Sequence, residues 1–301
     1  ISIASDIVPA MGENRILADH GLRQLNNNPS VGVKALLNIC GLVGKELTMS
    51  DIVFKIGPRI NASGRVQNGK QSVDLLVERD ADKAKVLAET INEYNEERKE
   101  LDKRTTEESS RMVAEMLKDK DEGAIVIYNP DWHKGVIGIV ASRLTEEYFR
   151  PAVVLTLDGG IVTGSARSVS GFDVYKAIQH CEDLLENFGG HTYAAGLSMK
   201  AANVEEFTRR FKAYVTEHID SEKIMATLDI HAVVNFRDIT HRFHSDLKRM
   251  RPFGPDNPKP MLCTMHVFDY GTSKVVGRQQ EHIKLELVDS KSNNVVNGIA
   301  F

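Results

Sequence analysis

The chain has 301 residues, of which 42% are hydrophobic and 27% are charged, as in an ordinary globular protein large enough for two domains and part of a third. Its 38 Lys and Arg and 42 Asp and Glu leave a net charge of −4, which argues against a protein that coats nucleic acid non-specifically but not against a local basic groove. No apolar run reaches the ~18 residues of a membrane span. We therefore expect a chain without a membrane partner.

The three cysteines, Cys40, Cys181 and Cys263, lie far apart in apolar surroundings and form no Cys-X-X-Cys pair. We interpret them as buried, reduced thiols, which indicates the cytoplasm and argues against a zinc or iron–sulfur site.

Both ends of the chain read as strands that continue outside it. The opening ISIASDIVPA has no Met, no basic stretch and no signal-cleavage pattern, and the closing NNVVNGIAF stops on an apolar run. We expect a truncation at each end. Asp6 follows the first of these strand-like runs, where α/β enzymes place metal ligands, but one carboxylate alone cannot hold a catalytic metal.

Residues 1 to about 75 are expected to be mostly helical. The run SVGVKALLNICGL predicts a helix that ends at Gly41 or Gly44, and a further helix starts with Ser50 or Thr48 as its N-cap. The pattern breaks at Gly57-Pro58, so GPRINASGR is expected to be a loop.

One long polar helix is predicted from residue 80 to about 118, a stretch without Gly or Pro. Leu87, Ile91, Tyr94 and Leu101 share one stripe, and the Glu/Lys-rich remainder reads as a solvated face. Such a helix is typical of a connection between two domains.

From residue 123 to about 220, short apolar strands alternate with helices, which predicts an α/β sheet domain. The expected strands are GAIVIYN, PAVVLTL, IVTGSAR and YAAGLSM, and the expected helices are GVIGIVASRLTEEY, FDVYKAIQHCEDLLENF and NVEEFTRRFKAYVTEHI. Beyond residue 223 a helix in HSDLKRMRPFGPDNPKP interrupts short strands, including MATLDIHAVVNF, SKVVGR and HIKLELVD, at a spacing that suits an incomplete barrel of the OB type.

Two stretches combine glycine with residues that bind phosphate, and in each a plainer interpretation stays open. In GPRINASGR, Arg59 and Arg65 flank Asn61, and they either present guanidinium forks to an anion or are simply solvated, two interpretations that are even. In DWHKGVIGIVASR, His133 precedes a helix start that suits an anion, although a packed Trp132 and a surface His133 are favoured slightly.

Two further stretches end or begin strands of the α/β region. Ser165, Arg167 and Ser168 in TGSARSVSGFD are suited to a phosphate pocket, or else Ser168 or Ser170 caps the next helix.

In FGGHTYAAG, we expect Gly189 to cap a helix in the left-handed conformation and Gly190 to admit a ligand close to the backbone. His191 is placed to donate to a phosphate oxygen there. On this stretch alone, an incidental histidine beside a helix cap is the stronger interpretation.

Together, ASDIVP, GENRIL, GPRINASGR, WHKGVIGIVASRL, GSARSVSGFDVYKAI, FGGHTYAAGLSM and PFGPDNPKP occur in an order that resembles the RecJ family of the DHH phosphoesterase superfamily over nearly the whole chain. The resemblance implies an α/β protein in four parts. These are the C-terminal part of a DHH catalytic domain (1–78), a connecting helix (79–122), a DHH-associated domain with a mixed sheet (123–222) and an incomplete OB-like nucleic-acid-binding domain (223–301).

The resemblance further implies a 5′-to-3′ exonuclease specific for single-stranded DNA, which releases 5′-mononucleotides in repair and recombination and uses two Mn²⁺ or Mg²⁺ ions. Its suggested partners, besides single-stranded DNA, are a single-strand-binding protein and a RecQ-type helicase. Asp6 matches a metal ligand, and His191 belongs to the loop that faces the scissile phosphate. The positions that match phosphate or DNA contacts are Arg59, Asn61, Arg65, His133, Ser165, Arg167, Ser168, Gly189 and Gly190.

The Asp-His-His signature of the superfamily is absent from this sequence. We therefore expect the parent protein to be an exonuclease and this chain alone to lack a two-metal site. The alternatives are a single-stranded-DNA-binding module without catalysis and a DHH-family phosphodiesterase acting on oligonucleotides or cyclic dinucleotides.

Overall fold

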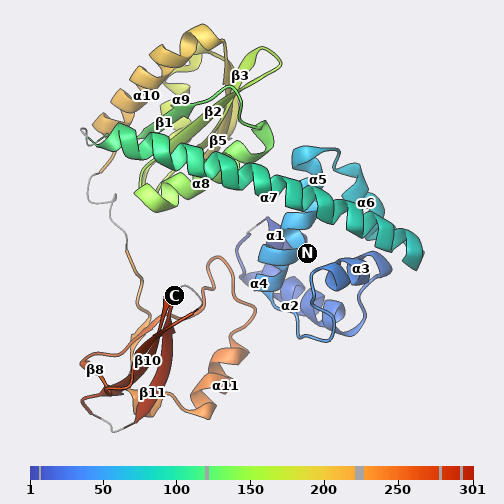
Figure 1. Cartoon of the computed structure of the whole chain (residues 1–301), viewed down its shortest axis with the longest axis vertical. Coiled ribbons are helices and arrows are strands. Elements are labelled where there is room, and N and C mark those ends of the chain that lie inside the picture. The colour runs from blue at the N-terminus through green and yellow to red at the C-terminus, as the bar shows by residue number, and fades with distance from the viewer. Residues whose placement is uncertain (7, 119–121, 221–226, 278–279, 292–293) are drawn as a thin grey trace. The chain divides into compact units, whose positions relative to one another are not determined.

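The structure, a computed structural model, describes residues 1–6, 8–118, 122–220, 227–277, 280–291 and 294–301 (Figure 1). The chain divides into two compact units. One comprises Ile1–Pro29, Lys45–Phe54 and Thr227–Phe301, and the other comprises Ser30–Gly44 and Lys55–Ala226. None of the helices in the described ranges combines the length and the apolarity that spanning a membrane requires.

The helices of the first unit are α1 (Ser2–Ser5), α2 (Gly12–Asn27), α4 (Met49–Asp51) and α11 (His241–Arg249). The prediction of a strand at the start of the chain is wrong, because Ser2–Ser5 is helical and Asp6 is its C-cap. Six residues of mixed apolar and small side chains are too few to separate the two periodicities. Thr48 is confirmed as an N-cap, since its hydroxyl accepts from the N–H of Asp51 and the Asp51 carboxylate accepts in return.

The first unit also contains an open sheet in which one strand holds three partners. Strand β10 (His282–Asp289) pairs antiparallel with β11 (Val295–Ala300), β8 (Val267–Asp269) and β9 (Lys274–Val276), while β6 (Ala232–Val233) pairs in parallel with β7 (Leu262–Cys263). The long strand expected in MATLDIHAVVNF is therefore wrong except at Ala232–Val233, because residues 227–231 and 234–235 are not in a strand and Phe236 begins a 3₁₀ turn. Its first two residues and Arg278 of SKVVGR lie outside the described residues. Within the described ranges the sheet does not close, as expected for an incomplete barrel.

In the second unit, α3 (Val31–Ile39), α5 (Gly57–Val66) and α6 (Lys70–Val77) pack against α7 (Ala81–Leu117). Gly41, with φ +64°, follows the end of α3 as predicted. The loop predicted for GPRINASGR is wrong. Pro58 lies in the first turn of α5, and α5 continues directly from a π-helical turn, Ile52–Ile56, so the chain stays helical through the Gly57-Pro58 pair.

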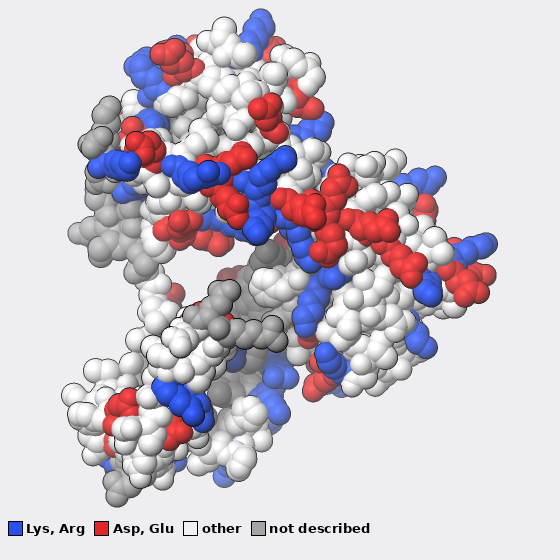
Figure 2. Space-filling view, in the orientation of Figure 1, with Lys and Arg blue, Asp and Glu red and all other residues white. Residues whose placement is uncertain are grey.

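The long helix is confirmed as α7, and the Asp80 carboxylate caps it by accepting from the backbone N–H groups of Asp82 and Lys83. Acidic and basic side chains lie side by side along its exposed side (Figure 2). One such pair is Lys103 and Glu107, four residues apart. The solvated-face interpretation is nevertheless wrong for Asp102, which is buried.

A five-stranded mixed sheet follows in the order β1-β2-β3-β5-β4. Its strands are β1 (Ile125–Tyr128), β2 (Ala152–Asp158), β3 (Ile161–Arg167), β4 (Leu185–His191) and β5 (Ala194–Met199). Only the β1–β2 pair is parallel. The mixed sheet predicted for this region is confirmed.

Helices cover both faces of the sheet (Figure 1). Helix α8 (Lys134–Tyr148) packs on the face that carries Ala152 and Val154, whereas α9 (Val174–Gln179) and α10 (Val204–His218) pack on the opposite face. The single helix predicted for FDVYKAIQHCEDLLENF is wrong beyond Gln179, because a 3₁₀ turn and strand β4 follow. As an edge strand that is mostly exposed, β4 lacks the apolar alternation by which strands are recognised.

All three cysteines are free thiols, but only Cys181 is buried, and Cys40 and Cys263 are half-buried. Burial raises the pKa of Cys181 to about 11, which keeps it an unreactive thiol.

Candidate phosphate-binding site around helix α8

The first turn of α8 is built on His133, its N-cap. The Nδ1 atom of His133 accepts from the N–H of Gly135 at 3.1 Å, so the ring proton is assigned to Nε2, which remains a donor. Trp132 is packed, as the sequence analysis favoured. It is buried, and its Nε1 donates to Glu108 at 2.7 Å.

Arg167, at the end of β3, is held in place by three hydrogen bonds. Its Nε donates to Ser142 Oγ of α8 at 3.1 Å, and its Nη1 donates to Ser165 Oγ at 2.9 Å and to the Ala166 carbonyl at 2.8 Å. A methyl group on Gly138 of α8 would lie 3.1 Å from Nη2 of Arg167, so the helix passes close to the guanidinium. The result is a fixed, half-buried cation beside a hydroxyl.

Arg65, in the last turn of α5, brings a second guanidinium to α8. Its Nη1 donates to the Gly135 carbonyl at 3.0 Å, and a methyl group on Gly135 would overlap the Arg65 carbonyl. Burial, and then the charge of Arg65, lowers the pKa of Arg167 below its ordinary value. Among the described residues, Arg65 donates to a backbone carbonyl and the charge next to Arg167 is that of Arg65, so a bound anion would relieve the repulsion between the two guanidinium groups.

His191 lies at the same edge of the sheet as Arg167. Ala194 of β5 pairs with Arg167 on one side and with His191 of β4 on the other. Residues paired across neighbouring strands project to the same face, so Arg167 and His191 do. Their backbones are two strand spacings apart, which amounts to about 9–10 Å. His191 is exposed, and its Nδ1 accepts from the N–H of Tyr193 at 3.3 Å.

The two glycines before His191 lie on opposite faces of β4, and neither caps a helix, so the cap predicted at Gly189 is wrong. Gly189 pairs with Gly196, which pairs with Ser165, and no atom lies within 4 Å of a methyl group built on Gly189. We name Gly189 and Gly196 the glycine shelf. Gly190 has φ +153°, and a methyl group there would overlap the backbone of Ala194 and Ala195. The side-chain position of Gly190 is therefore filled by β5, whereas that of Gly189 is open.

The different surroundings of Gly189 and Gly190 predict different effects of an added side chain on stability. Gly190→Ala is expected to cost about 2–3 kcal/mol of the free energy of unfolding, because the φ angle and the overlap with β5 both disfavour a side chain. Gly189→Ala, the matched control, is expected to stay within about 0.5 kcal/mol. Denaturant unfolding measures both, and an equal loss in the two variants would show that the backbone of Gly190 is not the constraint.

Other predicted residues are held away from Arg167. The Ser168 hydroxyl donates to the Phe172 carbonyl at 2.8 Å and closes the loop after β3, and the cap of α9 is Asp173, not Ser168 or Ser170. Arg59 donates to Asn92 on α7 at 2.9 Å, and Asn61 is exposed on α5.

Asp6 belongs to the other unit, where it is exposed at the end of α1. Across the part of the chain that the structure describes, no three His, Cys, Asp or Glu side chains are grouped to hold a metal ion. The residues present therefore do not form a divalent-metal site by themselves.

Sequence reasoning missed the supports on α8. Gly138 and Ser142 are four residues apart and share one helix face, so the spacing was a usable signal. It identifies Arg167 as their partner only once the sheet register is known.

The sequence matches two family models, the DHHA1 domain over residues 121–217 and the RecJ OB domain over residues 230–301. It is 33% identical over 294 residues to the single-stranded-DNA-specific exonuclease RecJ of Bacillus subtilis strain 168, a match that covers 97% of this chain and 37% of the relative.

Comparison with solved structures gives the same family as the sequence comparison. The fold is similar to that of RecJ from Thermus thermophilus in complex with Mn²⁺, with a TM-score of 0.85 at 27% identity, covering 98% of this chain and 42% of that one. For the Mg²⁺ complex from the same organism the TM-score is 0.83 at 27% identity, covering 95% and 43%. The chain thus spans less than half the length of these relatives.

Proposed function

Because the chain belongs to the RecJ family, which it matches over nearly its whole length, we propose that it is the C-terminal portion of a 5′-to-3′ exonuclease specific for single-stranded DNA. The enzyme hydrolyses phosphodiester bonds to 5′-mononucleotides in repair and recombination. The observation that carries the site assignment is Arg167, a half-buried cation that is fixed by Ser142 and Ser165 and lacks an acidic partner among the described residues.

We assign the 5′-terminal phosphate to Arg167 and Ser165. A guanidinium fork matches phosphate geometry, and partial burial strengthens each charged hydrogen bond. Arg65 and the Nε2 donor of His133 at the start of α8 add to this site. Ser168 supports it by closing the adjacent loop.

The single DNA strand continues from its terminal phosphate over the glycine shelf, where the DNA backbone can approach the protein backbone. His191 faces the scissile phosphate at the far side of the shelf, next to Gly190. Arg59 and Asn61 of α5 contact the DNA strand further from its 5′ end. The path over the shelf rests on the shared face of Ser165, Gly196 and Gly189.

The proposed cofactor is Mn²⁺ or Mg²⁺, the ions in the Thermus RecJ crystal structures. When bound, such ions activate water for attack on a phosphodiester. Asp6 is the one ligand that we assign to this chain, and we place the others in residues outside it.

A cleavage and binding titration tests the function. Labelled single strands are incubated with Mn²⁺ and either the 301-residue chain or the full-length protein, with double-stranded DNA as the control. We expect the full-length protein to release mononucleotides, and the chain alone to bind, with an affinity that falls steeply with salt, but to release none.

Each other outcome contradicts part of the proposal. Release by the 301-residue chain would refute the assignment of most ligands to residues outside it. Binding without release by the full-length protein would favour a non-catalytic binding module, and cleavage only of short oligonucleotides or cyclic dinucleotides would favour a small-substrate phosphodiesterase.

We further propose the four-part division 1–78, 79–122, 123–222 and 223–301, although residues 119–121 and 221–226 near two of its boundaries lie outside the described residues. The domain matches at 121–217 and 230–301 support it. A single-strand-binding protein and a RecQ-type helicase are the proposed protein partners, and the cytoplasm is the proposed location.

A further inference from the structure

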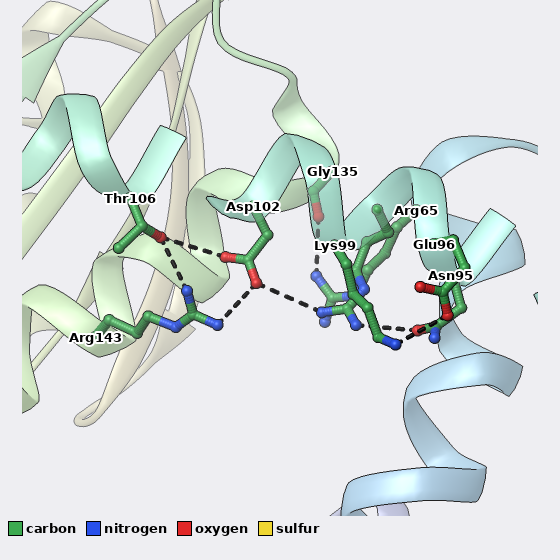
Figure 3. A network of polar contacts seen from close by, with 9 residues as sticks. Arg65, Asn95, Glu96, Lys99, Asp102, Thr106, Gly135 and Arg143 are labelled. Atoms are coloured by element: carbon green, nitrogen blue, oxygen red, sulfur yellow. Dashed lines mark hydrogen bonds and ion pairs between the residues drawn. The ribbon is translucent and has the colours of Figure 1, made fainter. Parts of the chain in front are cut away.

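A buried carboxylate on the long helix α7 connects two arginines and a threonine (Figure 3). The Asp102 side chain is only 5% exposed. Its Oδ2 accepts from Nη2 of Arg143 on α8 at 2.8 Å and lies 3.6 Å from Nη1 of Arg98. Thr106 donates to Oδ1 at 3.4 Å and accepts from Nη1 of Arg143 at 3.0 Å. Both carboxylate oxygens are therefore engaged.

Helix α8 is the common support of the proposed phosphate site. It accepts from Arg65 at the Gly135 carbonyl and from Arg167 at the Ser142 hydroxyl. Arg143 is the next residue after Ser142, so the ion pair with Asp102 acts one residue from the atom that holds Arg167. The rotation and position of α8 therefore set where both guanidinium groups lie.

Helices α7 and α8 also share an apolar contact, which is non-directional. Val113 of α7 belongs to an apolar cluster with Val140 and Leu144 of α8, and such packing tolerates small rotations. The hydrogen-bonded pair of Asp102 and Arg143 has a defined geometry, so it can select one rotation.

Asp102 also supplies negative charge next to the arginines. Burial lowers the pKa of Arg98, the charges of Arg65 and Arg143 lower it further, and Asp102 opposes these effects. Without this carboxylate, three guanidinium groups would repel one another across α7, α5 and α8.

We propose that Asp102 is a positioning residue for phosphate recognition, which fixes α8 through Arg143 and so holds Arg167 and Arg65 at the distance that a 5′-terminal phosphate requires. The inference rests on the proposed function. It concerns a residue that touches no substrate and that lies, on α7, outside every predicted binding stretch.

The test uses the full-length protein, with Asp102→Asn as the variant and Glu107→Gln as the matched control. Glu107 is on the same helix, is 62% exposed and pairs only with Lys103 among the described contacts. Asp102→Asn is expected to lower the preference for 5′-phosphate over 5′-hydroxyl single strands, measured as the ratio of KM values, by about three- to tenfold. The kcat at saturating substrate is expected to stay within about twofold, and the control is expected to leave both quantities unchanged.

A second variant guards against loss of folding. Arg143→Gln removes the same pair from the α8 side at a side chain that is 45% exposed, and it is expected to reproduce the loss of preference. Equal changes of KM for both substrates, or a normal preference in both variants, would overturn the positioning role.

Arg167→Ala separates this inference from the proposed function. In that background, Asp102→Asn should change the preference no further, because the group it positions is gone. If Arg167→Ala abolishes the preference while Asp102→Asn and Arg143→Gln keep it, only the role of Asp102 fails. If Arg167→Ala itself keeps the preference, the phosphate site fails, and the role of Asp102 fails with it.

Discussion

Replacing Arg167 with Ala in the full-length protein is expected to weaken binding of 5′-phosphorylated single strands by about 2 kcal/mol, or roughly 30-fold, while strands with a 5′-hydroxyl lose far less. The reason is the fixed, partly desolvated guanidinium, which donates to Ser165 and is held by Ser142. Binding measured without divalent metal, with both 5′-ends, gives the two affinities separately from cleavage.

The control for this prediction is Arg209→Ala. Arg209 is an exposed arginine of α10, on the opposite face of the sheet, and its partner is Glu206 on the same helix. Arg209→Ala should leave the affinities for 5′-phosphate and 5′-hydroxyl strands unchanged. If Arg167→Ala weakens the two substrates equally, Arg167 contributes a general charge and does not recognise the terminal phosphate.

Replacing His191 with Ala is expected to lower kcat of the full-length protein by about 100-fold and to change the affinity for single-stranded DNA by less than about twofold. His191 is exposed at the end of β4, and Nδ1 accepts from the Tyr193 N–H, which leaves Nε2 to donate to an oxygen on which charge develops. Single-turnover cleavage and metal-free binding separate the two quantities.

His218→Ala is the matched control for His191. His218 ends α10 and stacks on Tyr214 with ring centroids 4.0 Å apart, away from the glycine shelf, so cleavage should be normal. A normal kcat for His191→Ala would remove His191 from the reaction, and a parallel loss of binding and kcat would make it a binding residue only.

Elements with a strong apolar period were predictable from the sequence. Helix α7 and the buried strands β1 and β2 follow their patterns because burial on one stripe or on both faces forces the composition. Elements that bury little were not predictable. Strand β4 is an exposed edge, and α1 is a single turn. Pro58 was misread for a different reason, because it reads as a break although the π-helical turn Ile52–Ile56 continues into α5.

The same distinction holds in the candidate site. Ser165 and Arg167 are two residues apart on one strand and share a face by the strand period alone, so the sequence sufficed to pair them. Asp102 and Arg143 are 41 residues apart, and Asp102 sits in a charge run that resembles a solvated surface. Only the packing of α7 on α8 reveals that its carboxylate is buried.

The anchoring of two guanidinium groups to one helix makes the length of that helix inflexible. A residue inserted between Gly138 and Ser142 would turn everything after it by about 100°, which would carry Ser142 away from Arg167 while Gly135 stayed with Arg65. The Gly159-Gly160 turn between β2 and β3 is expected to tolerate such a change, because both residues are exposed and lie clear of neighbouring atoms. Insertions and deletions among homologues should therefore accumulate in that turn and be missing from α8.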